Sequence, residues 1–218
     1  MSRGEVHVLF PFPPHMPNIG IVMLQGSREA HAQALYQASK LLKINVVIKE
    51  LRTVGDLNDS DLAAVVIPGG ESTTMRKVGG HEGTKILPEI YKIIRKKPFF
   101  PVLATCAGAI LLADPQDGGE PLLQAKVERN AFGRQVDSFF GEVQVAGSNE
   151  SANCAFIRAP RFTAVSENSG IAFLKGEPVG IREKNLIALT FHPELSETSI
   201  FHEMLLSSAI SNTGGDQI

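Results

Sequence analysis

The sequence predicts an α/β fold with three layers, in which helices flank both faces of a mostly parallel central sheet. Short, continuous apolar runs recur along the chain, and such runs are typical of strands buried on both faces. Segments with helical periodicity lie between several of these runs, as expected of a parallel sheet. A length of 218 residues is sufficient for one good-sized hydrophobic core.

The strands are predicted from apolar or β-branched runs that turn residues or polar residues bound. In chain order they lie at residues 19–24, 45–48, 63–67, 99–105, 124–128, 154–158, 162–165, 178–182 and 186–190. The first run ends at Gln25-Gly26, and Pro68-Gly69-Gly70 stops the third abruptly. The second half of the chain is therefore expected to be rich in strands.

The helices are predicted from apolar side chains that recur on one face. They lie at residues 27–43, 86–94, 106–113 and 198–206. The first is the most regular, because Ala34, Leu35 and Ala38 share a face and Ser27 is available as the N-cap.

The chain is expected to form a single domain at residues 18–212, since it contains neither an internal repeat nor a linker. Residues 1–17 are rich in proline and lack a pattern, which predicts a disordered extension or a true start at Met16. Residues 213–218 are expected to be a flexible tail.

Composition excludes several classes of function. A formal net charge of −2 argues against a nucleic-acid partner. Charge or proline interrupts every apolar run well before the roughly 18 residues of a membrane span. The N-terminal segment is a poor signal peptide, and the two cysteines do not suggest a disulfide framework, so we expect a cytoplasmic protein.

Cys106 lies where the predicted strand at 99–105 runs into a helix that begins Ala-Gly-Ala. Small residues permit the sharp strand-to-helix turn that exposes a nucleophile. The helix N-terminus also favours the thiolate, the form that attacks a carbonyl carbon. The local sequence leaves an alternative open, because most free cysteines are small buried core residues.

His192 and Glu194 follow the predicted strand at 186–190. In extended backbone, residues two apart project to one side. Glu194 could then accept a hydrogen bond from one ring nitrogen of His192 and leave the other nitrogen for a thiol. Taken alone, this segment could equally be a surface or capping turn. Together with Cys106, it favours a Cys-His-Glu triad.

Gly69 and Gly70 end a predicted strand and allow the backbone to turn its amide N–H groups toward a ligand. An oxyanion hole requires such donors. Paired glycines often mark only a turn, and the spacing of a nucleotide-binding P-loop does not occur in this sequence.

The order of these elements resembles that of class I glutamine amidotransferases, and more narrowly the glutaminase subunit of pyridoxal 5′-phosphate synthase. The motifs that carry the resemblance are spread along the chain. They are Leu24-Gln25-Gly26, Pro68-Gly69-Gly70-Glu71-Ser72-Thr73, Thr105-Cys106-Ala107-Gly108, Glu128-Arg129-Asn130-Ala131-Phe132-Gly133-Arg134-Gln135, Phe156-Ile157-Arg158-Ala159-Pro160 and Phe191-His192-Pro193-Glu194-Leu195.

The resemblance implies a flavodoxin-like sheet that carries a Cys106-His192-Glu194 triad. The triad would hydrolyse L-glutamine to L-glutamate and ammonia, and the ammonia would pass to a separate synthase subunit in a hetero-oligomeric complex that makes vitamin B6. No metal or organic cofactor is implied. Backbone N–H groups of Gly70 and Ala107 would form the oxyanion hole. The positions that match the family's glutamine-binding residues are Gly70, Glu71, Ser72, Arg129, Ile157, Arg158 and, on weaker grounds, Gln25.

Two residues depart from the family pattern. Pro101 lacks the N–H that a central strand donates, and Ala104 stands where the family usually has glycine, so a shifted or bulged elbow is expected. These departures keep two alternative functions open. One is a non-catalytic binding or regulatory subunit on the same fold, and the other is a different cysteine hydrolase on a flavodoxin-like sheet.

Overall fold

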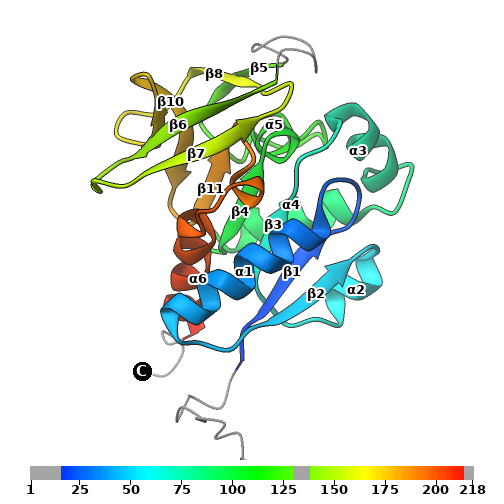
Figure 1. Cartoon of the computed structure of the whole chain (residues 1–218). Helices are drawn as coiled ribbons and strands as arrows, with labels where there is room; N and C mark the ends of the chain where they lie inside the picture. The colour runs from blue at the N-terminus through cyan, green and yellow to red at the C-terminus, as the bar shows by residue number, and fades with distance from the viewer. Residues whose placement is uncertain (1–15, 130–137, 214–218) are drawn as a thin grey trace, which may run out of the picture.

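The computed structural model describes residues 16–129 and 138–213 (Figure 1). Most of the expected extension, most of the expected tail and residues 130–137 lie outside this part of the chain, and so does the glutaminase-like motif from Asn130 to Gln135. A nine-stranded sheet runs through the centre in the order β2-β1-β3-β4-β11-β10-β9-β6-β7. A second, two-stranded sheet pairs β5 (Lys126–Glu128) with β8 (Arg161–Ala164).

One half of the central sheet is parallel. Its strands are β2 (Val47–Leu51), β1 (Asn18–Val22), β3 (Leu62–Ile67), β4 (Val102–Thr105) and β11 (Leu186–Leu189). The other half is antiparallel and consists of β10 (Glu177–Glu183), β9 (Gly170–Leu174), β6 (Phe139–Val145) and β7 (Ser151–Phe156). The predicted α/β fold with a parallel sheet is confirmed, and the strand-rich second half extends that sheet.

Helices cover both faces of the parallel half (Figure 1). The helices are α1 (Arg28–Leu42), α2 (Val54–Asn58), α3 (Ser72–Gly79), α4 (Ile86–Lys96), α5 (Ala107–Ala113) and α6 (Ile200–Thr213). Along β3, Ala64 and Val66 pack in the core that α1 and α6 cover, whereas Val65 and Ile67 pack in the core under α4 and α5. Strand side chains alternate between the two faces, and this alternation produces the three predicted layers.

Helix α1 forms where the apolar periodicity predicts it. The hydroxyl of Ser27 accepts a hydrogen bond from the Ala30 N–H at 3.3 Å, and Lys43 ends the helix in the left-handed conformation. Its buried face contains Leu35 and Ala38 and also one histidine, His31. None of the helices in the described ranges is long and apolar enough to cross a membrane.

Several elements differ from the prediction. Helices α2 and α3 and strands β6 and β9 were not expected, because they are short or lack clear periodicity. Helix α6 continues to Thr213, well beyond the predicted end at residue 206. Residues 157–158, predicted as strand, lie beyond the end of β7. These two residues therefore belong to a loop, where their side chains are free to face a pocket.

The structure accommodates both departures from the family pattern. Strand β4 begins at Val102, so Pro101 lies outside the ladder, and its carbonyl accepts a hydrogen bond from the Val65 N–H at 3.0 Å. Ala104 pairs in continuous register with Ile67 and Ala188. The expected bulge is therefore absent from β4, because proline precedes the strand and its missing N–H costs no ladder bond.

Candidate active site

The predicted site residues come together at the carboxyl end of the parallel strands. Strands β1, β3, β4 and β11 are neighbours, and the segments that follow them carry Gln25, Gly70, Cys106 and His192, respectively. A pocket of about 360 Å³ opens there. Its lining includes every predicted site residue except Gln25, and it also includes Gly26, Ser27, Gly69, Ile110 and Leu195.

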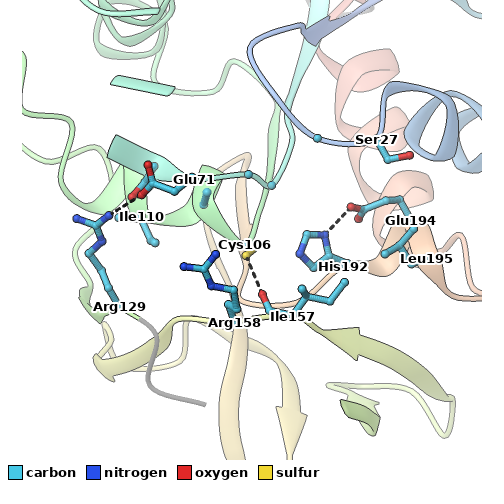
Figure 2. A pocket seen from close by; sticks show the side chains of 15 residues that line it. Ser27, Glu71, Cys106, Ile110, Arg129, Ile157, Arg158, His192, Glu194 and Leu195 are labelled. Atoms are coloured by element: carbon cyan, nitrogen blue, oxygen red, sulfur yellow. Dashed lines mark hydrogen bonds and ion pairs between the residues drawn. The ribbon is translucent and has the colours of Figure 1, made fainter. Parts of the chain in front are cut away.

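Cys106 occupies a strained turn between β4 and α5. Its backbone has φ 49° and ψ −108°, a conformation that residues with a side chain rarely adopt. The Cys106 N–H donates to the Leu189 carbonyl at 2.8 Å, and the thiol lies 3.8 Å from the Ile157 carbonyl (Figure 2). A Cβ on Gly108 would lie 2.3 Å from the Ile67 carbonyl oxygen, so the turn requires glycine there.

His192 and Glu194 are in direct contact. The Nδ1 atom of His192 lies 2.8 Å from Oε1 of Glu194 (Figure 2). The backbone N–H of His192 donates to the Ala155 carbonyl at 2.9 Å. The predicted pairing is present, but its backbone is not extended. Residues Pro193–Leu195 form a 3₁₀ turn, which curls the carboxylate back toward the ring.

The charges at the site favour an imidazolium beside a carboxylate. Burial acts to lower the pKa of His192, but hydrogen bonds and charge from Cys106 and Glu194 outweigh it and raise the pKa to about 10. Burial likewise acts to raise the pKa of Glu194, whereas His31 and His192 act more strongly together and lower it. Glu194 is therefore ionised, and His192 holds a proton that it can give to a leaving group.

The glycine loop after β3 lies against both catalytic candidates and Gln25. A Cβ on Gly69 would lie 2.4 Å from Cε1 of His192 and 3.2 Å from Cβ of Cys106. Gly70 has φ 153°, and a Cβ there would lie 2.7 Å from the Gln25 side chain. Gln25 accepts a hydrogen bond from the Glu71 N–H at 2.6 Å. Gln25 therefore braces the loop and does not line the pocket.

Glu71 caps helix α3 at the rim of the pocket. Its carboxylate accepts hydrogen bonds from the N–H groups of Thr73 and Thr74, and these bonds lower its pKa to about 2, although burial acts to raise it. Arg129 donates to Glu71 at 3.1 Å and to the Thr73 hydroxyl at 2.9 Å. Arg129 and Glu71 thus form an ion pair at the surface in this structure.

The pocket has two chemically different ends. Figure 2 shows Arg129 and Arg158 on one side of Cys106, and His192 and Glu194 on the other. Ser72 lines the same pocket, and its buried hydroxyl has no hydrogen-bond partner within residues 16–129 and 138–213. The site can therefore hold a small molecule with an anionic group toward the arginines and a reactive group at the thiol.

Sequence reasoning missed two residues close to the site. His31 on α1 and His202 on α6 are both fully buried, and His31 Nε2 lies 3.5 Å from Oε1 of Glu194. Both stand on apolar helix faces, His31 near Leu35 and His202 beside Phe201. A histidine on the apolar face of an amphipathic helix was a usable signal, although such a residue is often only a satisfied core side chain.

The second cysteine lies apart from this chemistry. Cys154 is buried, its sulfur is 4.0 Å from the Ser196 hydroxyl, and burial raises the pKa of its thiol to about 11. Both cysteines are unpaired. Across the described ranges, no group of three or more His, Cys, Asp or Glu side chains is arranged to hold a metal ion.

Comparison with known proteins identifies the family. The model of the SNO glutamine amidotransferase family matches residues 21–211. The chain belongs to this family. The match covers all the segments that form the pocket, and it confirms the glutamine amidotransferase resemblance on which the site prediction rests.

Individual members of the family are similar over nearly their whole length. Pyridoxal 5′-phosphate synthase subunit PdxT of Thermococcus gammatolerans is 37% identical, and the alignment covers 89% of this chain and 100% of that protein. PdxT of Thermoplasma volcanium is 40% identical, with 87% and 94% covered. A crystal structure of a glutamine amidotransferase superposes with a TM-score of 0.72 at 38% identity, covering 88% of this chain and 98% of the other.

Proposed function

We propose that the chain hydrolyses L-glutamine to L-glutamate and ammonia, with Cys106 as the nucleophile, His192 as the acid and base, and Glu194 as the residue that orients His192. One observation carries the proposal. A thiol on a strained elbow shares a pocket with an imidazole whose Nδ1 lies 2.8 Å from a buried carboxylate, which leaves Nε2 for the thiol.

The reaction divides into two steps at Cys106. Its thiolate attacks the carboxamide carbon, and the N–H groups of Gly70 and Ala107 would hold the oxyanion that forms. The His192 imidazolium then gives its proton to the departing nitrogen, so ammonia leaves and a γ-glutamyl thioester remains. Neutral His192 next takes a proton from water, and the hydroxide adds to the thioester. The tetrahedral intermediate then expels the Cys106 thiolate and glutamate leaves, which restores the thiolate beside the His192 imidazolium.

The proposed pose of glutamine follows the distribution of charge in the pocket. The carboxamide lies at Cys106, and the α-carboxylate points toward the arginine side, where Arg158 is exposed and lines the pocket. Arg129 can bind the same α-carboxylate if it gives up its ion pair with Glu71. Glu71 is then free to bind the α-ammonium group of glutamine. Ser72 and Ile157 complete the proposed contacts, and Gln25 acts through the loop that it braces.

The ammonia is proposed to pass to a separate pyridoxal 5′-phosphate synthase subunit for vitamin B6 biosynthesis, within a hetero-oligomeric complex. The similar proteins named PdxT are subunits of that synthase, which supports this assignment. We further propose that residues 18–212 act as one glutaminase domain in the cytoplasm and that the hydrolysis itself uses no cofactor.

The decisive experiment measures glutamate release by the purified chain, alone and with a candidate synthase subunit. Cys106→Ala is expected to remove activity, with a loss that can approach about 10⁶-fold for a missing nucleophile. Cys154→Ala is the matched control and should retain activity, because that thiol lies outside the pocket. A glutamine-analogue electrophile should label Cys106 in competition with glutamine. Undiminished turnover by Cys106→Ala would refute the proposal.

A further inference from the structure

Two buried histidines continue the row of polar side chains beyond the proposed triad. His31 and His202 are both 0% exposed, in the interface between α1 and α6. His31 Nδ1 lies 3.1 Å from His202 Nε2, and His31 Nε2 lies 3.5 Å from Oε1 of Glu194. Neither histidine lines the pocket, so neither can touch a substrate there.

The hydrogen-bonding roles of these atoms follow from the carboxylate at the centre. Glu194 Oε1 is an acceptor and already receives the N–H of His192 Nδ1 at 2.8 Å. Nε2 of His31 faces the same oxygen, so this nitrogen must also carry a hydrogen. That choice makes His31 Nδ1 an acceptor and His202 Nε2 its donor. The row runs in one direction, from His202 through His31 to Glu194.

Both histidines remain uncharged. Burial lowers the pKa of His202 to about 3, and the nearby His31 acts in the same direction while Glu194 only partly opposes it. Burial also lowers the pKa of His31 despite the charge of Glu194, and His192 acts in the same sense as burial. The positive charge of the cluster thus stays on His192, which faces the pocket.

Packing alone does not account for this cluster. Oε2 of Glu194 and Nδ1 of His202 have no hydrogen-bond partner within the described ranges. Apolar residues could fill the α1–α6 interface without leaving such atoms unpaired. Both ring nitrogens that face the carboxylate, Nδ1 of His192 at 2.8 Å and Nε2 of His31 at 3.5 Å, approach Oε1. Thr105, whose hydroxyl lies 3.4 Å from His31 Nε2, connects the same ring to the residue before Cys106.

We propose that His31 and His202 are positioning residues for the glutaminase reaction, a neutral histidine pair that holds Glu194 and thereby fixes the orientation and tautomer of His192. This inference rests on the proposed function of the triad. It assigns no contact with glutamine to either histidine, so it predicts an effect on the chemical step and little effect on substrate binding.

The test compares His31→Leu, which removes the N–H donor, with His31→Gln, whose side-chain amide can donate to Glu194. In the complex with the synthase subunit, His31→Leu is expected to lower kcat by about 10–100-fold, by analogy with the loss of a residue that orients a metal-binding histidine. KM should change little, and His31→Gln should recover most of the lost kcat. His81→Leu and His81→Gln are the matched controls, since His81 is exposed and outside this cluster.

Nitrogen-15 NMR of the wild-type chain supplies a readout that does not depend on any variant. His31 should be a neutral Nε2–H tautomer near neutral pH, and His192 should be an imidazolium with protons on both ring nitrogens. A charged His31, or a neutral His31 that carries its proton on Nδ1, would overturn the proposal. A folded His31→Leu variant with the kcat of the wild type would also overturn it. Should that variant not fold, the wild-type tautomer decides. If only the positioning role is wrong, Cys106→Ala is still inactive. If Cys106→Ala is active, the proposed function itself is refuted.

Discussion

Replacing Gly69 with alanine tests how closely the glycine loop after β3 packs on His192, the proposed catalytic histidine. The backbone at Gly69 does not have a positive φ, so alanine is compatible with its conformation. The added Cβ would lie 2.4 Å from Cε1 of His192, whereas carbon atoms in contact are ordinarily about 3.5–4.0 Å apart. The imidazole must therefore retreat by roughly 1 Å, because the loop is held from behind by Gln25.

A misplacement of about 1 Å in a catalytic group can cost about 10²-fold in rate. We therefore expect Gly69→Ala to lower kcat for glutamate release by roughly 100-fold, with a smaller change in KM, when it is assayed in the complex. Overpacking should also lower the free energy of unfolding by about 1–3 kcal/mol. Gly55→Ala is the matched control, since its Cβ would approach nothing closer than 3.4 Å. Wild-type kcat in a folded Gly69→Ala would refute the packing argument.

Three further predictions concern neighbouring features of the site. Gly70→Ala places a Cβ 2.7 Å from Gln25 at φ 153°, so displacement of the Gly70 N–H, the proposed oxyanion donor, should cost up to about 10²–10³-fold in kcat, and unchanged kcat would contradict this. Glu71→Ala removes the N-cap of α3 and should lower the free energy of unfolding, measured with urea, by about 0.5–2 kcal/mol. Urea unfolding curves with the same midpoint and slope as the wild type would argue against this. The raised pKa of His192, about 10 against an ordinary 6.5, stabilises the folded state below pH 6.5, and this stabilisation is lost as the pH rises toward 10. The Tm difference between wild type and His192→Gln should shrink over that interval. A Tm difference that grows with pH would contradict a His192 pKa that is raised on folding.

The sequence by itself determined the features that depend on neighbouring residues. Apolar runs predict the parallel strands because a strand buried on both faces needs apolar side chains at successive positions. The position of Cys106 between such a run and Ala-Gly-Ala predicts the elbow, and the structure places it there at φ 49°. The parallel strands also explain why Gly70, Cys106 and His192, far apart in the chain, meet at one edge of the sheet.

Only the tertiary structure decided which distant side chains meet around that framework. It pairs Arg129 with Glu71, sets Gln25 behind the glycine loop and brings His202 to His31, which lies 171 positions earlier in the chain. It also showed that Glu194 reaches His192 through a 3₁₀ turn and not through extended backbone. Local patterns cannot specify such contacts, because they depend on which loops and helices the fold brings together and on which polar atoms that packing leaves to be satisfied.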